Sequence, residues 1–96
     1  MTNKQKPQIV PLGTIYATTR ALHALGGDTG FLKGLLNRYL AHDWGECGDE
    51  ERRANDEAVL KGGRVLATYR GAYGEKIWII TEADRSATRI LLPDEA

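Results

Sequence analysis

The residues best suited to chemistry lie close together near the middle of the chain. An imidazole, two carboxylates and a thiol occur within six residues, contributed by His42, Asp43, Glu46 and Cys47. These groups bind zinc in proteins, but a closed zinc site needs further ligands. His23 is the only other histidine, and the chain has one cysteine. We therefore expect no metal and no cofactor here, but a polar loop with Trp44 packed beneath it.

The same cluster contains the groups of a cysteine nucleophile, with His42 or His23 as its base. The neighbouring carboxylates oppose that role, because negative charge disfavours the thiolate that attacks. Nor does the sequence carry a nucleotide-binding fingerprint. The segment Gly62-Gly63-Arg64 lacks the spacing and the Lys-Ser/Thr pair of a P-loop. We therefore interpret the chain as a binding protein and not as an enzyme.

A second polar stretch, residues 81–88, joins two strongly apolar segments. In a functional interpretation, Glu82 and Asp84 form a carboxylate pair while Arg85 and Ser86 orient a ligand or partner. In a structural interpretation, Asp84 and Ser86 make the side-chain to backbone hydrogen bonds of a turn, and Arg85 pairs with a nearby carboxylate. Both interpretations stay open, although eight residues exceed the length of most hairpin connections.

Hydrophobic periodicity indicates the elements that position these groups. Alternating apolar residues and β-branched runs predict strands at residues 12–17, 64–70, 76–81 and 89–92. Apolar stripes predict helices at residues 20–25, 29–41 and 50–61, with Thr18 or Thr19, Asp28 and Asp49 as N-caps. Helices grouped between strands are typical of an α+β fold. We expect a small antiparallel sheet, made of the N-terminal strand and a C-terminal three-strand meander, covered by two to three helices.

Length and composition indicate one small domain in the cytoplasm. A chain of 96 residues forms a single core, and we place this domain at residues 9–96 behind a flexible tail, residues 1–8. The predicted core residues are Leu32, Leu35, Leu36, Leu40, Val65, Ile77, Ile79 and Leu91. The N-terminus lacks the apolar stretch of a signal peptide, and no segment has the length of a membrane span. The lone cysteine fits a reducing compartment.

The charge distribution indicates a protein partner more than nucleic acid. Net charge at pH 7 is zero, so no overall basic field attracts nucleic acid, and no direct contact with it is expected. An acidic segment, residues 43–57, holds seven acids against Arg52 and Arg53. It could mimic phosphate charges, with Trp44 as an aromatic anchor. The candidate contact residues are Asp43, Trp44, Glu46, Asp49, Glu50 and Glu51, together with Glu82, Asp84, Arg85 and Ser86. Alternatively, the acids only solvate a surface helix.

Several stretches resemble a family of small bacterial proteins carried by plasmids and other mobile elements. The stretches are LGTIYATTRAL, HDWGE, EERRANDEAV, KGGRVLATY and KIWIITEADRSATRILLPDE, which cover nearly the whole chain after the tail. Members are often labelled "plasmid-related" or "type I restriction endonuclease subunit M", although a methyltransferase needs a far larger cofactor-binding fold. The resemblance implies an accessory role on mobile DNA and assigns no catalytic residues.

A second similarity concerns topology. A strand, helices and a meander containing GGRVLATYR resemble the ribosome-dependent RNase toxins of toxin–antitoxin pairs. Those toxins are strongly basic and carry arginine, lysine, tyrosine or histidine on their late strands. This chain is neutral and has no histidine after His42, which counts against RNA cleavage. A small RNase toxin dependent on Arg70 or Arg85 is therefore the alternative function.

We thus expect a non-enzymatic accessory protein of mobile DNA that binds a host or mobile-element protein complex. The first candidate partner is a CRISPR or restriction complex, whose activity the protein would inhibit. The sequence is also compatible with a homodimer.

Overall fold

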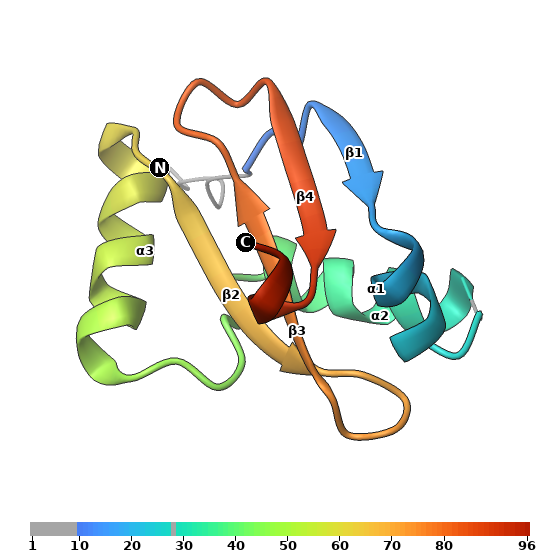
Figure 1. Cartoon of the computed structure of the whole chain (residues 1–96). Helices are drawn as coiled ribbons and strands as arrows, with labels where there is room; N and C mark the ends of the chain where they lie inside the picture. Colours follow the sequence, from blue (N-terminus) through green and yellow to red (C-terminus); the bar gives the residue numbers. More distant parts are fainter. Residues whose placement is uncertain (1–9, 28) are drawn as a thin grey trace, which may run out of the picture.

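The computed structural model describes residues 10–27 and 29–96, which form helices and strands around one sheet (Figure 1). In chain order the elements are β1 (Thr14–Ala17), α1 (Thr19–Ala24), α2 (Thr29–Leu40), α3 (Asp49–Lys61), β2 (Val65–Arg70), β3 (Lys76–Thr81), β4 (Ala87–Leu91) and the short 3-10 helix η1 (Pro93–Glu95). This order confirms the predicted α+β fold. The predicted tail at residues 1–8 and the predicted cap Asp28 lie outside the described residues. None of the described helices combines the length and the apolar character needed to cross a bilayer.

The sheet is mixed, so the prediction of a purely antiparallel sheet was wrong. Its strand order is β1-β4-β3-β2. The strands β2, β3 and β4 form the predicted antiparallel meander, but β1 runs parallel to β4, with Ile15 opposite Thr88. Parallel strands need a long crossover connection, and here the chain passes through the three helices, β2 and β3 between β1 and β4. Strand periodicity alone carried no information about the direction of β1.

The strand β1 also begins later than predicted, at Thr14. Gly13 adopts a positive φ of 63° and lies so close to the Ser86 carbonyl that a Cβ atom would collide with it. A residue with a side chain would be strained at this position for both reasons. Gly13 therefore turns the chain sharply into the sheet.

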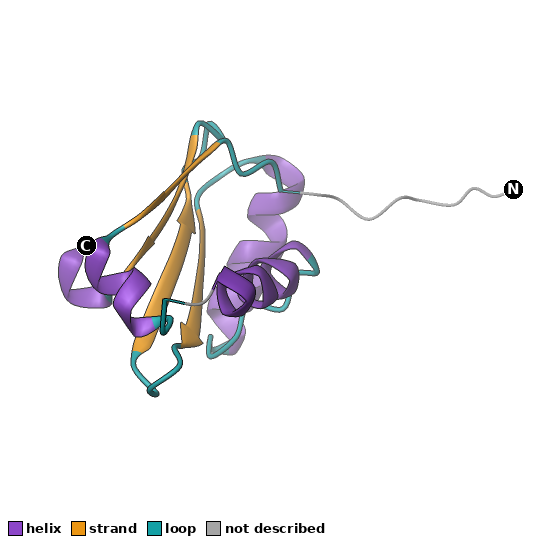
Figure 2. Ribbon diagram, turned by 90° about the vertical axis from the view of Figure 1, so that its right-hand side faces the viewer, coloured by secondary structure: helices purple, strands orange, loops and turns teal. Residues whose placement is uncertain are grey.

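Helices cover both faces of the sheet (Figure 2). In the two views α2 and α3 lie on one side of it, while α1 and η1 lie on the other. Five of the predicted core residues are buried, namely Leu35, Val65, Ile77, Ile79 and Leu91. Three others are only partly buried, namely Leu32, Leu36 and Leu40. The reason is that α2 buries a narrow stripe, formed by Leu35 and Tyr39, and not its whole apolar side.

The helix starts are capped as expected at α1 but not at α3. Thr18 Oγ1 accepts a hydrogen bond of 3.0 Å from the backbone nitrogen of Ala21, the arrangement predicted for α1. At α3 the N-cap is Gly48, and the predicted cap Asp49 is already the first helical residue. The carboxylate of Glu51 reaches back to the Gly48 nitrogen at 2.6 Å. A glutamate three residues after the cap thus supplies the acceptor that Gly48 lacks.

The polar connection between β3 and β4 is shorter than predicted, because Thr81 and Thr88 belong to the sheet. The two threonines lie opposite each other on neighbouring strands, and both are completely buried. The connection itself spans residues 82–86. Sequence periodicity could not show this, because threonine suits both strands and polar loops.

A chain of buried hydroxyl groups links α2 to both strands. The Tyr39 hydroxyl lies 2.7 Å from Thr81 Oγ1, which lies 2.8 Å from Thr88 Oγ1. Thr88 donates to the Leu12 carbonyl at 2.8 Å. Because a carbonyl only accepts and each hydroxyl has one proton, the hydroxyls all donate in the direction from Tyr39 to Leu12. Burial raises the pKa of Tyr39 to about 12, so its hydroxyl keeps the proton that it donates.

We expect Thr81→Val to lower the free energy of unfolding by about 1–3 kcal/mol, because it removes the middle hydroxyl, so that Tyr39 keeps only the Val65 carbonyl at 3.5 Å and Thr88 loses its donor. Thr68→Val is the matched control. Thr68 is a buried strand threonine whose hydroxyl makes no hydrogen bond with the described residues, so its loss should stay below about 0.5 kcal/mol. Urea denaturation followed by tryptophan fluorescence measures both values. Equal losses in the two variants would contradict the role of the hydroxyl chain.

Candidate functional site

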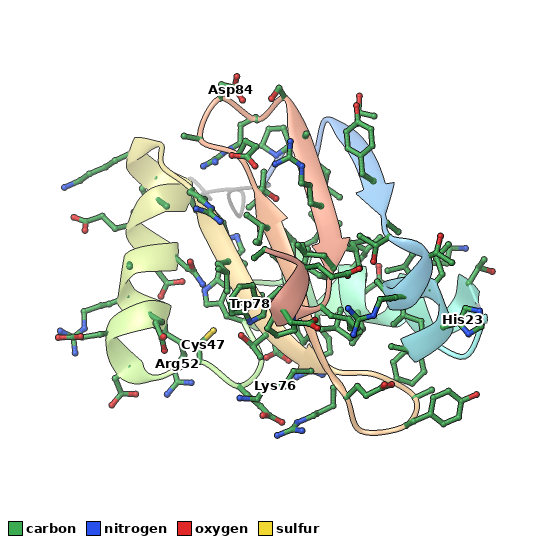
Figure 3. The ribbon with its side chains drawn as sticks, in the orientation of Figure 1. His23, Cys47, Arg52, Lys76, Trp78 and Asp84 are labelled. Carbon is green, nitrogen blue, oxygen red and sulfur yellow. The ribbon has the colours of Figure 1, made fainter. Side chains whose placement is uncertain are left out.

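The residues predicted to contact a partner form two groups, which the structure does not bring together. One group comprises the loop at residues 42–48 and the first turn of α3. The other is the connection between β3 and β4. Figure 3 shows Cys47 and Arg52, from the first group, near one end of the sheet and Asp84, from the second, at the other end. A single contact surface containing all the candidate residues is therefore not formed.

Trp44 lies inside the protein, which corrects its predicted role as a surface anchor. Its exposed fraction is 1%. The ring stacks on His42 with 5.3 Å between centroids and meets the edge of Tyr39 at the same distance. The indole nitrogen donates to the Asp56 carboxylate of α3 at 2.9 Å. The alternative interpretation, in which Trp44 packs beneath the polar loop, agrees with this position.

The loop that carries Trp44 also pairs with the outer edge of β2. Thr68 donates its N–H to the Trp44 carbonyl at 3.2 Å, and its own carbonyl accepts from Glu46 at 2.7 Å. Gly45 lies between these two bonds with φ 75°, so close to the Thr68 carbonyl that a Cβ atom would collide with it. This position therefore requires glycine. The segment adds a short parallel bridge to the sheet.

Asn55 of α3 pairs with another outward-facing residue of this edge, Leu66. Its side-chain nitrogen donates to the Leu66 carbonyl at 2.9 Å, and its side-chain oxygen accepts from the Leu66 nitrogen at 3.2 Å. The amide group therefore replaces a neighbouring strand at Leu66. Sequence reasoning missed this residue. The available signal was a polar side chain on the inner side of the third helix, between Ala54 and Ala58.

The thiol of Cys47 also forms hydrogen bonds at this edge of the sheet. Cys47 is buried and lies 3.2 Å from the Trp44 carbonyl and 3.7 Å from the Leu66 carbonyl, to which a thiol can only donate. Within residues 10–27 and 29–96, His, Cys, Asp and Glu form no group of three or more suited to a metal ion. The Cys47 thiol thus bonds to backbone carbonyls at the edge of the sheet.

The two acids of the loop are paired with arginines. The Asp43 carboxylate lies 2.8 Å from the Arg38 guanidinium, and the Glu46 carboxylate lies 3.0 Å from that of Arg70. The hydrogen bond from Arg38 holds the pKa of Asp43 below its ordinary value, and the bond from Arg70 does the same for the pKa of Glu46. These local cations reduce the negative potential that the pair can present to a partner.

The first turn of α3 is less fully neutralised. Asp49 pairs with Arg52 at 2.6 Å, and Glu51 is held by the Gly48 nitrogen. Glu50 has no hydrogen bond or ion pair with any residue of the described part and is exposed. Of the acids predicted to mimic phosphate, Glu50 is thus the one whose charge is available without breaking an existing contact.

Residues of the β3–β4 connection mainly hold that connection in shape. The Asp84 carboxylate accepts from the Ser86 nitrogen at 2.9 Å, which is the hydrogen bond of an Asx turn. Hydrogen bonding from the Ser86 side chain, and next from its backbone, lowers the pKa of Asp84. Glu82 pairs with Arg89 of β4 at 2.7 Å. The structural interpretation of this stretch therefore agrees with the observed contacts of Asp84, Ser86 and Glu82.

Arg85 joins the connection to the end of α3. Its guanidinium donates to the Ala58 carbonyl at 2.8 Å, the Gly63 carbonyl at 2.6 Å and the Glu82 carbonyl at 3.1 Å. A cation at this place also meets the negative end of the helix dipole. Arg85 adopts a positive φ of 62° to reach these acceptors. The structural interpretation gave Arg85 a carboxylate partner, but its observed partners are backbone carbonyls.

Comparison with protein-family models, with curated proteins and with solved structures found no match. The resemblance to mobile-element proteins and the topological similarity to RNase toxins therefore stay predictions.

We expect Arg85→Ala to lower the free energy of unfolding by about 1.5–3 kcal/mol, because it removes charged hydrogen bonds to three carbonyls. Arg89→Ala is the control, since its guanidinium is 55% exposed and makes a surface ion pair. Its cost should stay below about 1 kcal/mol. Chemical denaturation of the two variants gives the comparison. An Arg85→Ala protein as stable as the wild type would show that these bonds do not hold α3 in place.

Proposed function

We propose that this chain is a non-enzymatic accessory protein of mobile DNA that acts in the cytoplasm by binding another protein. The partner is a host defence complex, of the CRISPR or restriction type, whose activity the bound protein inhibits. The observation that carries this proposal is the outer face of α3, which offers charge and an exposed leucine on one rigid helix.

The helix α3 uses little of its surface for the core. Only Asn55 and Ala58 are buried, whereas Leu60 is 69% exposed. A shallow hollow on the outer side is lined by Glu50, Arg53, Ala54, Asp56, Glu57, Leu60 and Lys61. A regular helix held by Asn55 and Arg85 presents this surface without any need to reorganise, which lowers the cost of ordering it on binding.

The charge of this helix favours a basic partner. Asp49, Glu50 and Glu51 lie in the first turn, and the ion pair of Glu57 with Lys61 balances charge farther along. Arg53 lines the same hollow as Glu50, so the excess of negative charge on this helix is modest and lies in its first turn. Protein complexes that hold guide and target strands do so in positively charged channels. An acidic helix is attracted to such a channel by its field and could occupy the place of the phosphates.

The contacts of the arginines favour binding over the RNase alternative. A cleaving site would need Arg70 or Arg85 free to meet phosphate. Arg70 pairs with Glu46 and donates to the Gly74 carbonyl at 2.8 Å, and Arg85 is held by three carbonyls. Both guanidiniums would have to break their hydrogen bonds within the protein before they could contact RNA.

The proposal is tested by phage plaque assays on bacterial strains with defined defence systems, with and without this gene. We expect plaque formation to rise in one such strain. No relief in any CRISPR or restriction strain would contradict the proposed role. Growth arrest with cleaved mRNA would instead support the RNase alternative.

Glu50→Lys tests the contact surface once a relieved system is known. Binding of the purified protein to that complex should weaken roughly tenfold at low salt, and less at high salt, because exposed charges are screened. Glu75→Lys is the matched control. Glu75 is an exposed acid in the β2–β3 turn, and its carboxylate has no bonded partner among the described residues. Equal effects of the two substitutions would exclude α3 as the specific contact.

A further inference from the structure

The two outer edges of the sheet differ in how their backbone groups are satisfied. At the β2 edge, Thr68 pairs with the loop at residues 44–46, and Leu66 pairs with the Asn55 side chain. The opposite edge is formed by β1. A strand edge with free N–H and C=O groups can pair with another strand, and proteins normally cover or charge such edges.

The register of β1 shows which of its groups are free. Thr14 donates to the Ser86 carbonyl at 3.1 Å, and Thr18 donates to the Ile90 carbonyl at 3.0 Å. In a parallel ladder the residues between these donors point their N–H and C=O groups away from the neighbouring strand. Ile15 and Ala17 therefore direct both backbone groups outward. No described residue bonds to them on that side.

The side chains of β1 give this edge an apolar character. Ile15 is 45% exposed and Tyr16 is 55% exposed. The strand contains no lysine, proline or bulge of the kind that blocks pairing. A hollow beside it is lined by Tyr16, Ala17, Ala87, Arg89, Ile90 and Leu91, among others. Within the described residues, the edge thus combines unpaired backbone groups with a partly apolar surface.

We propose that β1 pairs with β1 of a second copy of this chain, antiparallel and across a two-fold axis. In the register that satisfies most groups, Ile15 lies opposite Ala17 of the second copy and Ala17 opposite its Ile15. This register forms about four backbone hydrogen bonds. It brings the two Tyr16 side chains together at the axis, over the hollows, and joins both sheets into one. The inference does not depend on the proposed function.

Charge favours a second copy as the occupant. Residues 12–19 are uncharged, and the whole chain is neutral, so two copies meet without net repulsion. The nearest cations are already paired, Arg89 with Glu82 at 2.7 Å and Arg20 with Asp94 at 3.0 Å. Among residues 10–27 and 29–96, this edge offers no charged group that would select a different strand. A short uncharged strand is self-complementary in a two-fold arrangement.

Sedimentation velocity of the full chain, from micromolar concentration to about 1 mM, tests the proposal. We expect the mass to rise from 10.6 kDa toward twice that value. Ile15→Lys should raise the dissociation constant at least roughly tenfold, because it places a charge on the pairing edge. Leu60→Lys is the control: it makes a comparable change at a 69% exposed position, on the helix that packs against β2 at the opposite edge. A wild-type protein that stays monomeric overturns the proposal, as does a dimer that Ile15→Lys leaves intact.

Cross-linking tests the register, even if a lysine variant fails to fold. Tyr16→Cys should give a disulfide-linked dimer under mild oxidation, because directly opposed residues of an antiparallel pair have Cβ atoms about 4.5–5.5 Å apart. Thr14→Cys is the control on the same strand. Its two copies would lie roughly 13 Å apart in this register, too far for a disulfide. Cross-linking of Thr14→Cys to the same extent as Tyr16→Cys, or of neither variant, contradicts this pairing.

Discussion

The closure of the β2 edge is the interaction on which much of this structure depends. A buried backbone polar group must be paired. Because β2 is an outer strand, its outward N–H and C=O groups have no neighbouring strand to pair with. The segment at residues 44–46 pairs with Thr68, and the Asn55 amide pairs with Leu66. These bonds fix the loop after α2 and the rotation of α3 about its axis. They bury Trp44 and Cys47 as a consequence, and they leave the outer side of α3 in solvent.

This arrangement shows which contacts the ligand-type residues of the central loop make instead. The loop contains four residues of metal-ligand type, His42, Asp43, Glu46 and Cys47. The backbone of their segment forms hydrogen bonds with β2, and the carboxylates of Asp43 and Glu46 form ion pairs with arginines. Arg85 then ties the far end of α3 to the β3–β4 connection through the Ala58 carbonyl. The molecule thus holds α3 at both ends, and a helix fixed in this way is suited to present a surface for binding.

Local patterns predicted the local structure well, because strand alternation and helix stripes are encoded in neighbouring residues. They located β3 at Lys76–Thr81 and α2 within one residue of its observed end. Most of the failures involve contacts that a local pattern does not encode. The direction of β1 depends on β4, Trp44 is buried against Tyr39 and α3, and Arg85 bonds to the end of α3. The predicted cap Asp49 was a local error of one residue. Of the candidate site, the exposure and charge of Glu50 and the turn formed by Asp84 and Ser86 followed from local sequence, whereas the free edge of β1 required the register of the sheet.

The contrast between one closed edge and one open edge is the central claim, and amide hydrogen exchange of β1 at different protein concentrations tests it most directly. The Tyr16 N–H faces β4 in the observed register and should be protected at every concentration. The N–H groups of Ile15 and Ala17 should exchange rapidly in dilute solution and become protected as the protein is concentrated. Protection of Ile15 and Ala17 in dilute solution would contradict an open edge. Rapid exchange that is independent of concentration would contradict pairing between copies.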